Sequence, residues 1–254
     1  MTTAVGVTVV AAFSLIGIAR TAAWEDIFRG ILEEVQATLD DPQLRNELTG
    51  EQIEMIETAQ ADIDATIADL SFAMGLDPAV AGMLWIVLSI VFLAVVVLAI
   101  DAFGSERTEP SELRTDRFAW KAFNLVVGVI VYWILFIIGL VFFVIPGLLF
   151  AFFMFFFPAA IALRGESFFS AFSSSAGVVR RNLLSTLGVI VIAIVVSVLL
   201  WFVGGFVPGV IGTIIGEVLS AIGMAFVFAM MALAYVDATA DSPDDSDEST
   251  AEPA

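Results

Sequence analysis

The chain has 254 residues, of which 60% are hydrophobic and only 15% are charged, whereas a soluble domain carries about 25% charged residues. It contains neither cysteine nor histidine, which excludes disulfides, thiolate or imidazole metal sites, and catalysis by a cysteine or by a Ser–His pair. The net charge of -18 disfavours nucleic acid as a partner. Lys121 is the one lysine among ten basic residues, and this acidic, arginine-biased composition is typical of proteins from salt-loving archaea.

The first predicted element is a membrane-spanning helix at residues 1–20. Its apolar part is short enough for a signal peptide, but it lacks a charged start, and Ala19-Arg20-Thr21 makes a poor cleavage site. We therefore expect a retained span. The remaining apolar runs are each about as long as the hydrocarbon core is thick, and they predict one span at residues 81–100 and two helical hairpins at residues 122–163 and 183–236.

Between the first two spans, residues 21–80 predict an acidic helical hairpin. Apolar residues recur at helical spacing from Trp24 to Leu39, and a second amphipathic helix starts at Thr49, where Gln52 is placed to close a capping box. We expect the two apolar stripes to face each other. The segment holds 14 acidic residues against Arg29 and Arg45. It is interpreted either as a solvated cap on the bundle or as a cation- or partner-binding module.

The basic residues set the predicted orientation. Lys and Arg cluster in the loop at residues 101–121 and in the segment at residues 164–182, and short basic connections stay in the cytoplasm. The hairpin at residues 21–80 would then be extracellular, and both termini of this cell-membrane protein would be cytoplasmic. The acidic tail, residues 237–254, should be disordered.

Each membrane hairpin is expected to reverse at a Pro-Gly pair, because proline suits the first turn of a helix and glycine tolerates a sharp reversal. The pairs are Pro146 with Gly147 and Pro208 with Gly209. Gly128-Val-Ile-Val131 recurs as Gly188-Val-Ile-Val191, which suggests that the two hairpins are repeats. Pro158 should kink the span that contains it.

Residues 164–182 are too polar to span and predict an amphipathic helix in the cytoplasmic interface. Phe168 and Phe172 share its apolar face, and Arg180 and Arg181 close its C-terminal end, where positive charge favours the helix dipole. The helix either positions the two hairpins or binds lipid or a partner.

At these residues the chain resembles a known family. Ile145-Pro146-Gly147, the aromatic-rich span that ends near Pro158, Glu166-Ser167 and Arg180-Arg181-Asn182 look like polytopic membrane proteins related to the membrane domain of glycerophosphoryl diester phosphodiesterases. The resemblance covers about residues 115–235. It implies a bundle of about six spans and no catalytic residue, because the soluble phosphodiesterase domain of some members, with its His and acidic active site, has no counterpart here.

Glu217 is the candidate functional residue within the membrane. It is the ionisable side chain well inside a predicted span, with no basic partner expected in another span. It is interpreted either as a proton or cation relay or as a carboxylate at the rim that reaches water. Around it Gly212, Gly216 and Ser220 form a small-residue stripe that would let another helix approach.

The sequence thus predicts an all-α integral membrane protein of about six spans, with an extracellular acidic helical hairpin and a cytoplasmic interfacial helix. A lone carboxylate cannot perform paired acid-base catalysis, so we expect no enzyme activity, cofactor or metal. The leading interpretation is a scaffold or interaction protein whose partners are the lipid bilayer and either other membrane proteins or a second copy. The alternative is a small transporter or channel subunit that uses Glu217 in a cation or proton path.

Overall fold

The computed structural model describes residues 4–40, 49–69, 72–105, 117–142, 144–204, 206 and 209–240. Within these residues every regular element is an α-helix. Six stretches are long and apolar enough to cross a membrane, which confirms the all-α, multi-pass class and the expected number of spans. They are Ala4–Leu39, Pro78–Gly104, Phe118–Phe142, Val144–Arg164, Leu183–Leu200 and Gly209–Ala240.

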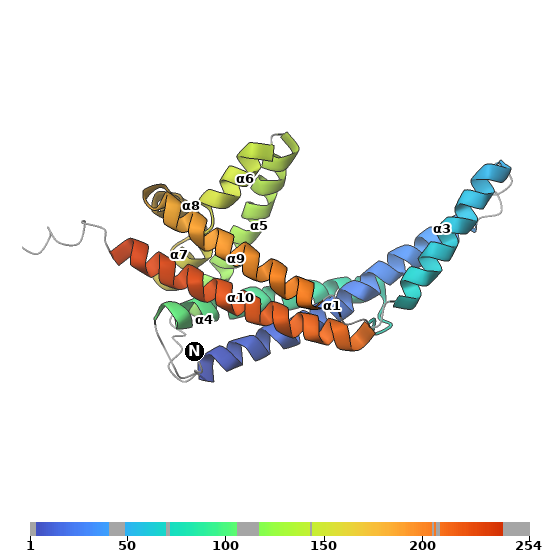
Figure 1. Cartoon of the computed structure of the whole chain (residues 1–254), viewed down its shortest axis with the longest axis horizontal. Helices are drawn as coiled ribbons and strands as arrows, with labels where there is room; N and C mark the ends of the chain where they lie inside the picture. Colours follow the sequence, from blue (N-terminus) through green and yellow to red (C-terminus); the bar gives the residue numbers. More distant parts are fainter. Residues whose placement is uncertain are drawn as a thin grey trace, which may run out of the picture. The chain divides into compact units, whose positions relative to one another are not determined.

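The helices are distributed over two compact units, which are described separately. One unit contains Phe13–Phe92 and Trp201–Leu219, and the other contains Leu93–Leu200 with both ends of the chain. The helices are α1 (Ala4–Leu39), α3 (Gly50–Asp69), α4 (Pro78–Gly104), α5 (Phe118–Phe142), α6 (Val144–Phe153), α7 (Phe157–Arg164), α8 (Phe168–Arg181), α9 (Leu183–Gly204) and α10 (Gly209–Ala240) (Figure 1).

Several predicted boundaries differ from the helix ends. α1 does not stop at residue 20 but runs unbroken for 36 residues, because the apolar run passes into an amphipathic pattern with no proline between them. α10 continues to Ala240, four residues into the segment expected to be a tail, and residues 241–254 lie outside the described part. Of the predicted loop at residues 101–121, both ends are helical, and residues 106–116 are not described.

Helices α5 and α6 contact each other backbone to backbone, with no side chain between them at the point of closest approach. A Cβ on Gly139 would lie 2.8 Å from the Cα of Gly147, and a Cβ on Gly147 would lie 2.8 Å from the backbone nitrogen of Leu140. The helices can therefore approach this closely only with glycine at both positions. Pro146 lies in the first turn of α6, where its missing N–H leaves no intrahelical bond unmade.

The span from Val144 to Arg164 is broken between α6 and α7, at residues 154–156, two residues before Pro158, as the sequence led us to expect. Lipid supplies no hydrogen bonds to a broken backbone. The hydroxyl of Ser175, from α8, fills this role: it accepts a bond from the Phe156 N–H at 3.0 Å and donates one to the Phe153 carbonyl at 2.8 Å. Ser175 is fully buried, so no water replaces it.

The start of α8 is fixed by Asn124 of α5. The side-chain oxygen of Asn124 accepts a bond from the Phe168 N–H at 3.1 Å, and its amide nitrogen donates to the Trp120 carbonyl at 2.9 Å. Ser167 caps the helix by accepting a bond from the Ser170 N–H. Gly165 separates α7 from α8 with a φ of 67°, a left-handed conformation that glycine adopts without strain. α8 is therefore held against α5, α6 and α7.

In the other unit α3 lies antiparallel beside the second half of α1 (Figure 1). Gln36 donates a hydrogen bond to Asp64 at 3.0 Å, and Gln60 donates one to Asp40 at 2.8 Å. Gln52 accepts a bond from the Thr49 N–H at 2.9 Å, which confirms half of the predicted capping box. The acidic segment is thus a helical hairpin, as the sequence predicts.

Two carboxylates of α1 hold the connection between α3 and α4. Asp26, which is 1% exposed, accepts bonds from the N–H groups of Met74 at 3.0 Å and Gly75 at 2.9 Å. Its neighbour Glu25 accepts one from the Phe72 N–H at 2.6 Å. Since hydrogen bonds to ionised groups are roughly twice as strong as neutral ones, these three bonds fix the base of the hairpin to α1.

We predict that Ser175→Ala destabilises the protein by about 1–3 kcal/mol, because two buried backbone groups at the α6–α7 break lose their partner. Thermal unfolding in detergent measures the loss. The matched control is Ser173→Ala, which removes an exposed hydroxyl from the same helix and should change little. Equal unfolding temperatures for the two variants would contradict the role given to Ser175.

We also predict that Asp26→Ala accelerates hydrogen exchange at the Met74 and Gly75 amides by about tenfold or more, because both lose a charged acceptor. Mass spectrometry of the exchanging peptide measures this. The amide of Phe72, which Glu25 binds, is an internal control and should keep its protection. Exchange that stays slow at all three positions would show that Asp26 does not hold the connection.

Candidate functional site

Glu217 lies in α10, about 12 Å from the start of that helix at 1.5 Å per residue. Its side chain accepts a hydrogen bond of 2.6 Å from the hydroxyl of Thr21 on α1. Gly17 lies one turn earlier on α1, where a Cβ atom would collide with the Glu217 carboxylate. Gly17 leaves room for the Glu217 carboxylate because it has no side chain, and the Thr21 hydroxyl holds the carboxylate in place by its hydrogen bond.

Arg20 adds a positive charge to this group. Its guanidinium lies over two rings of α4, with Cζ 5.2 Å from the centroid of Trp85 and 5.3 Å from that of Phe92. It is close enough to Glu217 for the two opposite charges to attract each other. The aromatic faces supply part of the favourable environment that water would otherwise provide.

The expectation that Glu217 lacks a basic partner in another span is therefore wrong. It failed because residue 20 was taken as the end of the first span, whereas α1 continues far beyond it. A signal was available in the sequence. Gly17, Arg20 and Thr21 are spaced three and four residues apart, which puts them on one face of a helix.

The chemistry open to this cluster is limited. It has a single carboxylate, and general acid-base catalysis by paired carboxyl groups needs two. No group of three or more acidic side chains that could hold a metal ion occurs among the described residues. A carboxylate, a guanidinium and a hydroxyl brought together inside a span instead balance charge and hydrogen bonding between α1, α4 and α10.

The small-residue stripe around Glu217 is only partly used for packing. Gly212 is buried, but a Cβ on Gly216 would meet nothing within 4 Å, and Ser220 is exposed. The close approach lies further along α10, where a Cβ on Gly223 would be 2.8 Å from the Leu200 side chain of α9. Of the two residues expected at the second hairpin turn, Gly209 starts α10 with a φ of 71°, and Pro208 lies outside the described residues.

The aromatic face of α8 packs inward. The ring of Phe172 lies 5.2 Å from that of Phe157 on α7 and 6.2 Å from that of Phe150 on α6. Tyr132 of α5 stacks on both of these partners, and Phe168 lies 6.3 Å from Phe172. Phe168 and Phe172, both half-buried, therefore join α8 to its own unit.

The exposed side of α8 carries other residues. Phe169 is 72% exposed, and Arg180 and Arg181 are exposed in the last turn. Near its start, Glu166 accepts hydrogen bonds from the hydroxyls of Ser170 at 3.0 Å and Ser174 at 2.7 Å. The exposed side of α8 is therefore polar apart from one aromatic ring.

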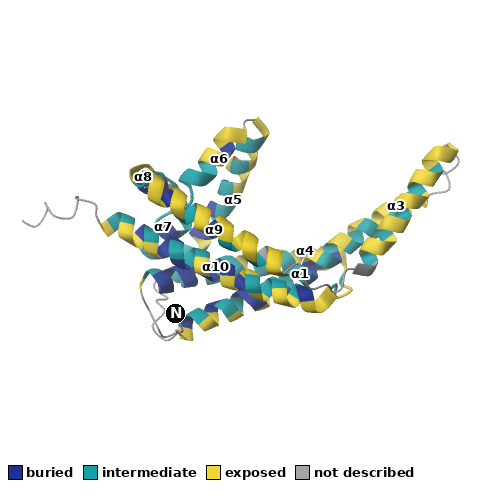
Figure 2. Cartoon of the chain, viewed as in Figure 1, coloured by how far each residue is buried: buried dark blue, intermediate teal, exposed yellow. Residues whose placement is uncertain are grey.

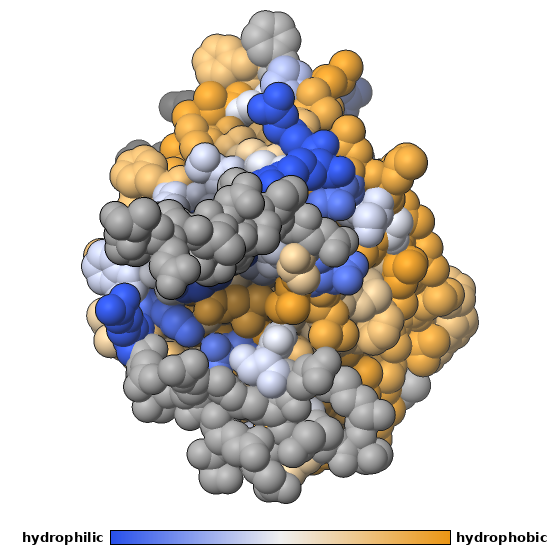
Figure 3. All heavy atoms as spheres, turned by 90° about the vertical axis from the view of Figure 1, so that its left-hand side faces the viewer, coloured by the Kyte–Doolittle hydropathy of each residue, from blue (hydrophilic) through white to orange (hydrophobic). Residues whose placement is uncertain are grey.

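Much of the remaining surface is apolar, as lipid contact requires. Exposed residues cover α5, α6 and α9 over much of their length (Figure 2), and most of the large ones are Ile, Leu, Val and Phe. Figure 3 shows apolar side chains over the right-hand side of the view, with polar ones in its upper middle and at its left edge.

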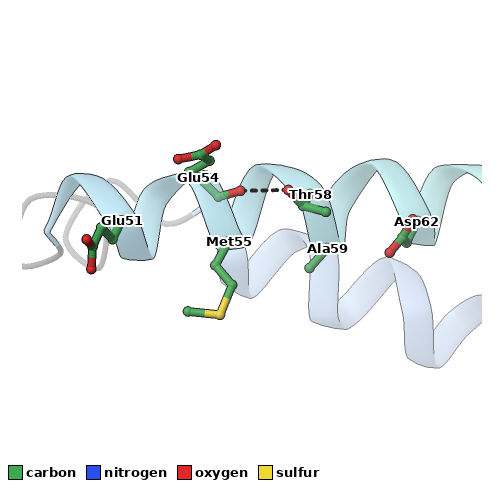
Figure 4. A pocket seen from close by; sticks show the side chains of 6 residues that line it. All are labelled: Glu51, Glu54, Met55, Thr58, Ala59 and Asp62. Atoms are coloured by element: carbon green, nitrogen blue, oxygen red, sulfur yellow. Dashed lines mark hydrogen bonds between the residues drawn. The ribbon is translucent and has the colours of Figure 1, made fainter.

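A shallow, open hollow lies along α3. It is lined by Glu51, Glu54, Met55, Thr58, Ala59 and Asp62 (Figure 4). All six come from one helix, and the hydroxyl of Thr58 is bonded to the Glu54 carbonyl at 2.9 Å. Such a surface does not enclose a small molecule, since ligand sites are concave and bury most of their ligand.

Comparison with known proteins assigns the chain to a family but names no activity. No curated protein and no solved structure matches the chain. A family model does match, over residues 63–239, which includes α4 to α10 and begins within α3. The chain belongs to the family described as Domain of unknown function (DUF7847).

Proposed function

We propose that this chain is a non-enzymatic protein of the cell membrane that binds and organises other membrane components. The observation that carries the proposal is the continuity of α1. Its apolar first half and its charged second half are one unbroken helix, and Asp26 fixes the base of the α1–α3 hairpin to it. The hairpin is thus rigidly attached to a membrane helix, and such a module is suited to contact a partner at a fixed height above the bilayer.

The proposal includes the orientation expected from the sequence. Lys121, Arg164, Arg180 and Arg181 lie at or near helix ends of α5, α7 and α8, in the connections that the positive-inside rule assigns to the cytoplasm. Both termini would then be cytoplasmic, and the hairpin would be extracellular. We further propose that the acidity of the chain maintains hydration in a salt-rich archaeal cell, and that its membrane domain is related to that of glycerophosphoryl diester phosphodiesterases.

The intramembrane cluster supports an organising role better than a transport role. A cation path needs a carboxylate that is free to exchange its partner. Glu217 is already bonded to Thr21 and faces the charge of Arg20. We propose that this cluster pins α1 to α10 and so fixes the direction in which the hairpin leaves the membrane.

We predict that Arg20→Met and Glu217→Gln each destabilise the protein, because each leaves an unbalanced charge in a span. The double variant has no unbalanced charge in the span. Its loss of unfolding free energy should therefore be smaller than the sum of the two single losses, by a coupling free energy of about 0.5–3 kcal/mol. Thermal unfolding in detergent provides all three values. Glu34→Gln, at an exposed position of α1, is the control and should have little effect.

If the stability lost in the double variant equals the sum of the losses in the two single variants, Arg20 and Glu217 do not act together. A transport role would be indicated instead by a proton or cation flux in proteoliposomes that the wild-type chain supports and Glu217→Gln abolishes while the fold is retained. Under the pinning role, neither protein produces a flux above that of empty vesicles.

The proposed function predicts specific neighbours in the native membrane. A photo-crosslinking residue at position 33 in the hairpin or at position 169 on α8 should give discrete protein adducts, because both side chains are exposed. The control position is 195 on α9, where the exposed valine should contact lipid. Adducts are read on denaturing gels. If neither position 33 nor position 169 gives more adduct than position 195, the interaction role fails.

A further inference from the structure

The α1–α3 hairpin has an apolar side that α3 does not cover. The sequence predicts that the stripe of α1 faces the stripe of α3. Yet Trp24 is 52% exposed, Phe28 36%, Ile31 50% and Val35 43%, although Trp24 also lies 6.4 Å from the Trp85 ring. We call these four residues the α1 stripe. Their spacing of four, three and four residues keeps them within about 60° of one another on the helix surface.

Every described contact that builds the hairpin lies on another face of α1. Asp26, which holds the connection, is about 180° around the helix from Val35, and Gly30, against which the Pro78 ring packs, is also on the far side. Gln36, which bonds to α3, is about 100° away from Val35. Phe28, Ile31 and Val35 therefore point away from the elements packed against the outer half of α1.

Lipid does not account for this exposure. α1 is about 54 Å long at 1.5 Å per residue, whereas the hydrocarbon core of a bilayer is about 30 Å thick. The segment without charges ends at Ala19, and Glu25, Asp26, Arg29, Glu33 and Glu34 follow. Phe28, Ile31 and Val35 lie among these charges, so they project beyond the hydrocarbon, where large apolar side chains at helical spacing mark a surface for another protein.

Charge identifies the kind of partner. Glu25 and Glu34 flank the α1 stripe on its two sides, each three residues from a stripe member. Across the described hairpin, residues 21–40 and 49–69, Arg29 is the one basic residue. A second copy would bring an equally acidic hairpin, and an anionic lipid surface would repel it. A helix with an apolar face and lysine or arginine along its edges would complement both the apolar surface of the α1 stripe and the negative charge beside it.

We propose that the α1 stripe is the docking surface for a basic, amphipathic helix of another protein. The proposal rests on the proposed interaction role and names the surface and the partner chemistry. Apolar contacts to Phe28 and Ile31 supply most of the affinity, because a few buried large side chains dominate helix docking. Glu34, at one edge of the α1 stripe, attracts a basic edge of the partner, which makes binding weaken as salt screens the charges.

The test uses the full chain in nanodiscs of phosphatidylcholine, which carries no net charge. The probe is a fluorescein-labelled 21-residue helical peptide with leucines at stripe spacing and lysines on both edges. A matched peptide carries glutamate in place of every lysine. Fluorescence anisotropy measures binding. We expect the lysine peptide to bind at least about tenfold more tightly than the glutamate peptide, and its affinity to fall with added salt.

One double variant, one single variant and one control locate the surface. Phe28→Ser with Ile31→Ser should weaken binding of the lysine peptide by about tenfold or more. Glu34→Gln should reduce the salt dependence. Met55→Ser, at a residue 67% exposed on α3 of the same hairpin, should leave binding unchanged. If the double serine variant does not show a cooperative thermal unfolding transition, it is not folded. Val35→Ser, further from the base of the hairpin, then replaces it as the test of the α1 stripe.

The proposal is overturned if both peptides bind alike, or if the stripe variants bind as tightly as the Met55 control. It is also overturned if Ile31→Cys yields a disulfide-linked dimer in membranes, since a second copy would then cover the α1 stripe. The interaction role can survive these results, because it fails only when crosslinking finds no protein neighbour. Adducts that persist in the Phe28 and Ile31 variant would show that the neighbours bind elsewhere on the chain.

Discussion

The fold depends on one constraint: a backbone polar group within hydrocarbon must find its partner in the protein. Helices meet this requirement almost everywhere, and the exceptions show how strict it is. Where Pro158 interrupts the span from Val144 to Arg164, a fully buried serine from another helix supplies both the missing donor and the missing acceptor. Where α8 begins, a buried asparagine of α5 supplies an acceptor. These two buried polar side chains thus supply hydrogen bonds that the helical backbone cannot make for itself at these points.

The same constraint explains how the ionised groups are distributed. Glu217 is hydrogen-bonded to Thr21 and is close enough to Arg20 for the two charges to attract each other, whereas Asp101 pairs with Lys121 at 3.5 Å in the other unit. Each pair joins different helices, so the cost of burying one charge is offset by a charge that arrives from elsewhere in the chain. In contrast, most carboxylates of the α1–α3 hairpin are exposed and remain hydrated. Asp26 is buried and Glu25 is half-buried because both accept hydrogen bonds from the backbone.

Periodicity and length were enough to predict the helical class, the six spans and the acidic hairpin, because these features follow from local hydrophobic patterns. Contacts between distant segments could not be predicted in this way. Helical spacing places Ser175 on the same face as Phe168 and Phe172, but it cannot show which backbone groups the hydroxyl binds. The attraction between Arg20 and Glu217 likewise acts between residues almost 200 positions apart. The repeat shows the same limit. Gly128 contacts Phe157 and Phe168, whereas a Cβ on Gly188 would meet nothing within 4 Å, so identical motifs lie in different environments.

The unbroken course of α1 has a mechanical consequence. A helix of 36 residues behaves as a stiff rod about 54 Å long, and a tilt of only about 10° at its base would carry its far end sideways by about 9 Å. Asp26 ties the connection to α4 to this rod, so the end of α3 nearest the bilayer would be drawn along. Small changes in bilayer thickness, which helices accommodate by tilting, would thus be magnified at the tip of the hairpin. With the hairpin outside the bilayer, as proposed, α1 would act as a lever between the lipid and a bound partner.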